Sequence, residues 1–176
     1  MPDHAYDPQH RGTKDDYADY YAGMDKSMSQ KVALVTSYLA LHGTVADMGS
    51  GSGKGSYDLA RLFPQLRIVG VDINPESVAY SDANYRADNL SFTEGDVAER
   101  VFADGTLDAI INSSVLHHVT SFNDFDVQRL YKLLDSHVAE LKPGGMLAVR
   151  DFVIPKEDKD ILVELPSDDG SATDDI

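Results

Sequence analysis

The chain has 176 residues, of which 42% are hydrophobic, which is enough for one compact α/β domain with its own core. Its formal net charge of −15, without a cluster of Lys or Arg, disfavours nucleic acid as a partner, because such binding depends on cationic contacts with phosphates. The absence of cysteine excludes disulfides and thiolate catalysis, and with no apolar run of membrane-spanning length and no secretory signal we expect a cytoplasmic protein without a membrane partner.

The first half of the chain begins with a helix and then alternates strand and helix. Ser27 and Gln30 form a capping box ahead of apolar positions at helical spacing, which predicts a helix to about His42. Residues 44–48 form a short apolar strand, and residues 56–63 form a helix that Pro64 ends.

The same alternation continues after Pro64. Residues 66–72 predict a second strand. Asn74 as N-cap and Pro75 at the first helical position then predict a helix to about Ala87. Two further strands are expected at 90–96 and 107–115.

The last predicted helix covers residues 125–141. Apolar residues recur there at intervals of three and four, which predicts one face packed on the sheet: Val127, Leu130, Leu134, Val138 and Leu141. The Pro and Gly residues at 142–145 end this helix, and residues 146–154 form a fifth strand.

The alternation of strands and helices predicts an α/β fold: a doubly wound, mainly parallel sheet with helices on both faces. Ligands of such sheets bind at the carboxyl ends of the strands, beside the point where the strand order reverses. The turn after the first strand is therefore the expected site.

That turn, "MGSGSGKG", has glycine at every second position from Gly49 to Gly55. A P-loop needs glycine where Met48 stands and a hydroxyl residue where Gly55 stands, so NTP hydrolysis is disfavoured. The third glycine of a dinucleotide fingerprint falls on Lys54 or Ser56, which is a partial match at best. An NAD-dependent oxidoreductase remains an alternative.

Five segments in order resemble the class I S-adenosylmethionine-dependent methyltransferases, which have a Rossmann-like fold: "VADMGSGSG", "VGVDIN", "EGDVAE", "LDAIINSSVLHHV" and "LKPGGMLAV". The resemblance implies S-adenosylmethionine as cofactor and S-adenosylhomocysteine as product. It also implies cofactor-binding residues after successive strands: Asp47, Gly49, Ser50 and Gly51, then Asp72 and Ile73, Asp96 and Val97, and Asn112 and Ser113.

In this resemblance Asp47 lies near the cofactor's amino group, Asp72 holds both ribose hydroxyls, and Asp96 and Val97 contact the adenine. A carboxylate that accepts two hydroxyls makes charge-assisted hydrogen bonds, which suits Asp72. Methyl transfer is an in-line displacement that requires orientation and exclusion of water, and it requires no metal.

Each acidic residue also has a simpler interpretation. Asp47 could cap its own turn, Asp72 could belong to the start of the following helix, and Asp96 is equally well explained as a turn residue. Tyr20 and Tyr21 in the aromatic N-terminal segment could cover the bound cofactor or could pack on the surface.

His117 and His118 follow the fourth strand, where acceptors bind in the family. Either could deprotonate a nucleophile near neutral pH, although packing or cofactor contact is the favoured interpretation. Two adjacent histidines without a third ligand at suitable spacing do not form a zinc site.

The C-terminal part departs from the family, because the last strands expected after the fifth are missing. We expect a cofactor-covering segment at 1–26, the methyltransferase core at 27–154, and an acidic tail or the start of a truncated substrate lid at 155–176. A homo-oligomer or a further segment could complete the sheet.

The resulting hypothesis is direct methyl transfer to a small-molecule acceptor. The alternatives are a non-catalytic cofactor-binding module or a fragment of a larger enzyme, the oxidoreductase, and a nucleic-acid methyltransferase, against which the charge argues.

Overall fold

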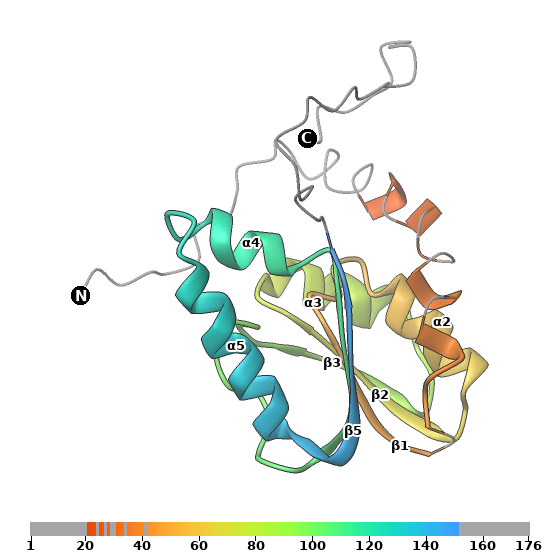
Figure 1. Ribbon diagram of the computed structural model, residues 1–176. Coiled ribbons are helices and arrows are strands. Elements are labelled where there is room, and N and C mark those ends of the chain that lie inside the picture. The colour runs from red at the N-terminus through yellow and green to blue at the C-terminus, as the bar shows by residue number, and fades with distance from the viewer. Residues whose placement is uncertain are drawn as a thin grey trace, which may run out of the picture.

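The computed structural model describes residues 21–23, 25, 26, 28, 31–33, 35–40 and 42–151. Its centre is a five-stranded parallel sheet with the strand order β3-β2-β1-β4-β5 (Figure 1). The strands are β1 (Gly43–Met48), β2 (Leu66–Asp72), β3 (Leu90–Glu94), β4 (Leu107–Ser113) and β5 (Leu141–Arg150). The order reverses between β1 and β4, so the carboxyl ends of these two strands border the switch point where α/β sheets bind ligands.

Helices cover both faces of this sheet. One face carries α2 (Lys54–Leu62), α3 (Pro75–Asn84) and the described helical residues between 21 and 36, whereas the other carries α4 (Leu116–Ser121) and α5 (Val127–Glu140) (Figure 1). The predicted doubly wound α/β fold is confirmed. None of the helices in the described ranges is long and apolar enough to cross a membrane.

Successive residues of a strand pack alternately into two hydrophobic cores, one on each face of the sheet. Val45 of β1 and Ile111 of β4 pack with α2 and with Val32 and Val35, while Met48 and Ile110 pack against α4 and α5. Because successive side chains of a strand point to opposite faces, these runs of apolar residues are buried on both sides.

The boundaries of β1 and β2 and the start of α3 agree closely with the sequence prediction, whereas α3 ends at Asn84 rather than at about Ala87. Asn74 caps α3 as predicted, with its side-chain oxygen accepting from the Glu76 N–H at 2.9 Å. β4 ends at Ser113 rather than at 115, and β5 begins at Leu141 because Leu107 pairs with Leu141 before a register shift. The predicted capping pair Ser27 and Gln30, and residues 152–154, lie outside the described residues.

The predicted buried face of α5 was wrong in part. Val127 and Val138 are 49% and 63% exposed, whereas Leu133, His137 and Glu140 are fully buried. The central stripe of the helix therefore contains two polar residues, which a search for apolar periodicity passes over. The six-residue helix α4 was not predicted at all.

Polar side chains tie the elements together at the amino ends of the strands. The Asn89 amide donates to the carbonyls of Ala60, Phe63 and Leu66. Asp108 accepts from the Thr44 N–H and from the Lys142 ammonium, each at 2.7 Å. These contacts connect neighbouring elements at the end of the sheet that lies opposite the candidate site.

Candidate functional site

The turn after β1 is held tightly against β2. Both the Gly49 and Ser50 N–H groups donate to the Val71 carbonyl, at 2.8 and 2.9 Å. Gly49, Gly51 and Gly53 have φ angles of 70°, 56° and 80°, in the left-handed region that side chains disfavour. A Cβ on Gly49 would lie 2.5 Å from Val115, so two of the reasons for glycine here are backbone angle and close approach.

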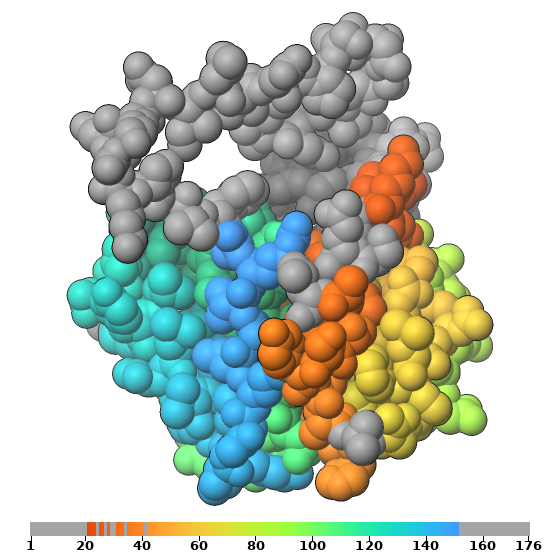
Figure 2. All heavy atoms as spheres, turned by 45° about the vertical axis from the view of Figure 1, so that its right-hand side comes forward, coloured from red at the N-terminus to blue at the C-terminus, as the bar shows by residue number. Residues whose placement is uncertain are grey.

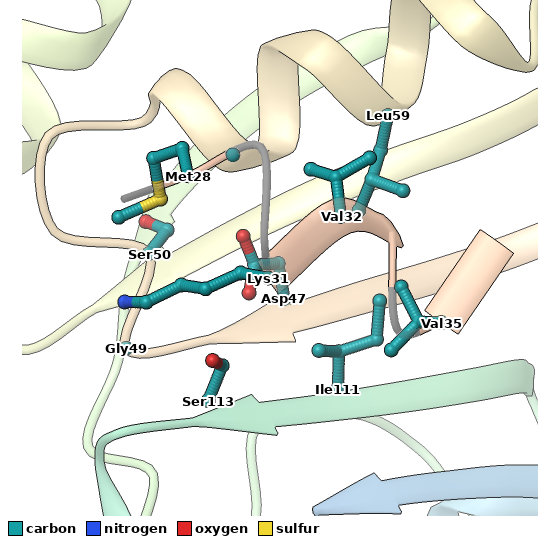
Figure 3. A pocket seen from close by; sticks show the side chains of 11 residues that line it. Met28, Lys31, Val32, Val35, Asp47, Gly49, Ser50, Leu59, Ile111 and Ser113 are labelled. Atoms are coloured by element: carbon teal, nitrogen blue, oxygen red, sulfur yellow. The ribbon is translucent and has the colours of Figure 1, made fainter. Parts of the chain in front are cut away.

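Asp47 ends up beside this turn at the base of a pocket (Figure 3). Its carboxylate accepts from the Ser56 hydroxyl at 2.6 Å. Burial raises the pKa of Asp47, while the Ser56 hydrogen bond and the charge of Lys31 act in the opposite direction. Gly55 leaves room for Met28, because a Cβ at this position would lie 3.1 Å from Met28 Sδ.

Lys31 is a site residue that sequence reasoning missed. Its side chain crosses the pocket above Asp47, with the ammonium group toward Gly49 and Ser50 (Figure 3). Burial lowers the pKa of Lys31, and the nearby charge of Asp47 partly restores it. A charged residue on the otherwise apolar face with Val32 and Val35 was the available sequence signal.

The rest of the pocket wall is largely apolar. Val32 and Val35 face Leu59 of α2 and Ile111 of β4 across it, and Ser113 lies at its β4 side (Figure 3). Opposite charges are thus held in a half-closed apolar cleft, where water screens them poorly.

Asp72 terminates β2 and touches the glycine turn. Its two carboxylate oxygens accept from the Gly51 N–H at 2.8 Å and from the Asn74 N–H at 2.9 Å. Burial raises the pKa of Asp72, and the two backbone hydrogen bonds counteract that effect. Since a carboxylate has about four lone-pair positions, two of them remain for a ligand.

Asp96 and Val97, predicted to contact the adenine, differ in exposure. Asp96 is exposed and accepts from the Ala98 N–H at 2.8 Å, the turn geometry that was its alternative interpretation. Val97 is 7% exposed and belongs to the core under α4 and α5. Ile73 is half-buried next to Asp72.

Asn112 and Ser113 point to opposite faces of β4. Ser113 lines the pocket, whereas Asn112 is fully buried and its amide nitrogen lies 3.2 Å from His137 Nδ1 on α5. The side chain of Asn112 is therefore engaged with α5 rather than with the pocket. Burial lowers the pKa of His137 to about 4.

His117 and His118 lie at the start of α4. His117 Nδ1 is 2.7 Å from Asp151 Oδ1, and Asp151 Oδ2 accepts from the Leu116 N–H at 2.8 Å. The rings of His117 and His118 are 4.0 Å apart, and His118 stacks on Phe122. Asp151, which follows β5 directly, is a second residue that sequence reasoning missed.

The N-terminal helical residues are fastened to the glycine turn and to α3. Tyr21 is 4% exposed, stacks on Tyr80 and shares a hydrogen bond with Ser77. Asp25 accepts from Ser52 in the turn at 2.6 Å and from Tyr85 at 2.8 Å. Tyr21 thus packs on α3 beside the turn, and Tyr20 lies outside the described residues.

Residues 46–149 match the sequence profile of the methyltransferase domain family, so more than half of the chain is covered and the chain belongs to this family. This range runs from β1, ahead of the glycine turn, almost to the end of β5.

Curated relatives agree with this assignment. The chain is 35% identical over 118 residues to an arsenite methyltransferase of Aquipseudomonas alcaligenes, covering 61% of this chain and 32% of the relative. It is 33% identical to a trans-aconitate 2-methyltransferase of Deinococcus radiodurans, covering 60% and 36% respectively. The chain therefore spans about a third of the length of these relatives.

Solved structures share the fold. Human N-acetylserotonin methyltransferase in complex with SAM superposes with a TM-score of 0.64 at 22% identity, over 80% of this chain and 39% of that one. A putative methyltransferase in complex with the Haloferax volcanii Trm112 activator gives a TM-score of 0.60 at 26% identity, over 78% of this chain and 61% of that one.

Proposed function

We propose that this protein is an S-adenosylmethionine-dependent methyltransferase that transfers the methyl group directly to a small-molecule acceptor. The observation that carries the proposal is the pair Asp47 and Lys31, held in one pocket beside the glycine turn. Membership of the methyltransferase domain family supports it further.

The residues present fit the cofactor. Its amino-acid arm bears an ammonium and a carboxylate, and Asp47 and Lys31 have the complementary charges. Gly49 and Gly51 have no side chains to fill the space beside this pair. Their left-handed backbone angles disfavour any other residue at these positions. Asp72 has lone pairs left for a ribose diol, as charge-assisted acceptors.

When bound, S-adenosylmethionine supplies a methyl group on a cationic sulfur, which a nucleophile can displace. Lys31 and Asp47 would fix the direction of the amino-acid arm, and Asp72 would fix the adenosine end. The apolar wall of Val32, Val35, Leu59 and Ile111 would exclude water from the part of the cofactor held beside Asp47 and Lys31. Orientation of this kind supplies about 7–11 kcal/mol of barrier reduction in favourable cases.

His117 lies at the carboxyl end of β4, toward the acceptor side of this arrangement. The hydrogen bond between Nδ1 and Asp151 orients the imidazole, which is the group we propose to take a proton from the nucleophile. A nucleophile that is already an anion has no need of this base, so the role of His117 depends on the acceptor.

The acceptor is proposed to be a small molecule because the chain has a net charge of −15. Phosphate backbones bind through cationic side chains, and each contact adds to the affinity. A nucleic-acid acceptor is therefore disfavoured, although curated relatives of the chain include a ribosomal RNA methyltransferase.

Isothermal titration of the full chain with S-adenosylmethionine and S-adenosylhomocysteine tests the cofactor. We expect binding of both, and a loss of about tenfold or more for Lys31→Ala and for Asp47→Ala, since a charge-assisted hydrogen bond contributes about 1.5–3 kcal/mol. Lys142→Ala, which removes a lysine at the amino end of β5 and thus at the opposite end of the strands, is the matched control.

Turnover is tested separately by formation of S-adenosylhomocysteine in the presence of acceptor mixtures. Binding without turnover would favour a cofactor-holding module over an enzyme. Absence of binding to either compound would contradict the whole proposal, and binding of NADH in their place would favour the oxidoreductase.

A further inference from the structure

Arg150 has no carboxylate partner among the described residues. Its guanidinium group donates to the hydroxyls of Ser114 at 3.0 Å and Ser113 at 3.5 Å, and it forms no ion pair with any carboxylate in the described part of the chain. The chain has twice as many acidic as basic residues, 30 against 15, so an arginine without an acidic partner is unexpected. A half-buried arginine is costly to desolvate unless an anion reaches it.

The strand register places Arg150 on the pocket face of the sheet. Arg150 is the register partner of Ser113, which lines the pocket. Met146 and Ala148, four and two residues earlier on β5, pack into the core that also contains Val32. Because side chains alternate along a strand, Arg150 shares this face.

Lys31 and Arg150 are therefore neighbours across the same opening. The described residues between 31 and 40 lie beside β5 in Figure 2. Burial is the main cause of the lowered pKa of Lys31, and the charges of Arg150 and Asp151 also act on it, in opposite directions, which agrees with the position of β5 beside Lys31.

The two cations face different parts of the site. Lys31 reaches toward the glycine turn between β1 and α2 (Figure 3), whereas Arg150 lies at the end of β5, beyond β4. If Lys31 binds the carboxylate of the cofactor, as the proposed function has it, Arg150 is left for an anion on a second ligand.

We propose that the methyl acceptor is an organic acid and that Arg150 binds its carboxylate. The planar guanidinium fork matches a carboxylate in two parallel hydrogen bonds. The fork also fits a phosphate, but protein sites for phosphate commonly add the N–H groups at the start of a helix. The first N–H groups of α4, the nearest helix start, are already taken, because Asp151 accepts from Leu116 and His117.

The ligand class is tested with the full chain saturated with S-adenosylhomocysteine. The probes are hexanoate, glutarate and benzoate, each titrated beside its amide, with hexyl phosphate as the phosphate probe. We expect at least one acid to bind about tenfold or more tightly than its amide, and hexyl phosphate to bind more weakly than that acid.

The residue is tested by Arg150→Gln, which keeps a polar side chain and removes the charge. This variant is expected to lose about tenfold or more in affinity for the acid while its affinity for S-adenosylhomocysteine is unchanged. Arg150→Lys keeps the charge but lacks the planar guanidinium fork. Its affinity for the acid should lie between those of the wild type and of Arg150→Gln. Arg67→Gln, at the amino end of β2, is the matched control and should leave the acid affinity intact.

Two results would overturn the inference. In the first, no acid of the set binds better than its amide, or hexyl phosphate binds best. In the second, Arg150→Gln weakens binding of S-adenosylhomocysteine as strongly as Lys31→Ala does, which would assign Arg150 to the cofactor. A wild-type chain that binds no S-adenosylhomocysteine would instead contradict the proposed function, so the two failures are distinguishable.

Discussion

A hydrogen bond of 2.7 Å between His117 Nδ1 and Asp151 Oδ1 connects the start of α4 to the residue that follows β5. The two residues are 34 positions apart in the sequence. The other oxygen of Asp151 accepts from the N–H groups of Leu116 and His117, so one carboxylate both caps α4 and orients the histidine. This helix has only six residues, and the side chain of its own N-cap residue, Val115, does not cap it. Its cap therefore comes from the residue that follows β5.

Replacing Asp151 by alanine should destabilise the protein by about 1–2 kcal/mol, because a helix cap and a charge-assisted hydrogen bond are lost together. Urea denaturation measures the change. Asp126→Ala is the control, since Asp126 caps α5 through a single bond to the Gln128 N–H and is exposed. A loss for Asp151→Ala no larger than that of the control would show that the histidine contact adds nothing.

Replacing Asp72 by alanine should weaken S-adenosylmethionine binding by about 10- to 100-fold, since unpaired ribose hydroxyls cost about 1–3 kcal/mol. Calorimetric titration gives the affinity. The variant also loses the acceptor for the Gly51 N–H, so its unfolding transition is measured in parallel. Asp104→Ala, at an exposed ion pair on the surface, is the control. Unchanged affinity would remove Asp72 from the cofactor site.

Replacing Gly49 by alanine should cost more stability than replacing Gly105 by alanine. Both glycines have similar φ angles, 70° and 63°, so both substitutions incur about 1–2 kcal/mol of left-handed strain. Only Gly49 has a neighbour in the way, with Val115 at 2.5 Å from the added Cβ, while nothing lies within 4 Å of the one at Gly105.

The double variant Gly49→Ala with Val115→Ala separates the two contributions to the Gly49 effect. Removing the valine methyl groups should lower the cost of Gly49→Ala, as judged by a double-mutant cycle in urea, but not to that of Gly105→Ala, because the Val115 Cβ itself lies 2.8 Å from the added Cβ. Purely additive effects would mean that the backbone angle alone requires glycine.

Stability should fall as the pH drops from about 6.5 toward 4, through His137. Burial lowers the pKa of His137 to about 4 in the folded chain, below its ordinary value of 6.5. The unfolded chain therefore binds the extra proton in this window, and each pH unit costs up to about 1.4 kcal/mol.

Urea unfolding at several pH values, with the wild type compared to His137→Gln, isolates this effect. The raised pKa values of Asp47 and Asp72 work in the opposite direction in both proteins, so they cancel in the difference. His42→Gln, at an exposed histidine, serves as the control. Equal pH slopes for wild type and His137→Gln would contradict the assignment.

The sequence predicted the strands and most of the helices because their signals are local. Asn74 and Pro75 start α3 through their own backbone preferences, and Pro64 follows the end of α2. The glycines of the turn were found for the same reason, since their spacing is visible in the chain itself.

The missed features depend on contacts between distant segments. α4 is short, and its cap comes from Asp151, 35 residues after Leu116. Lys31 and Arg150 were passed over because a cation is ordinarily a surface residue, and only the sheet register and the covering helical residues bring both to one opening. His137 and Glu140 were misjudged because polar residues on a buried stripe do not contribute to an apolar pattern.

The polar ties made by Asn89 and Asp108 all lie at the amino ends of the strands, whereas Asp47, Asp72, Lys31 and Arg150 gather at the other end. Substitutions that alter the choice of acceptor would therefore leave the hydrogen bonds of Asn89 and Asp108 unchanged. Because the stabilising contacts and the candidate site lie at opposite ends of the strands, acceptor specificity can change by single substitutions while the chain stays folded. The relatives of the chain are named for different acceptors, which agrees with this separation.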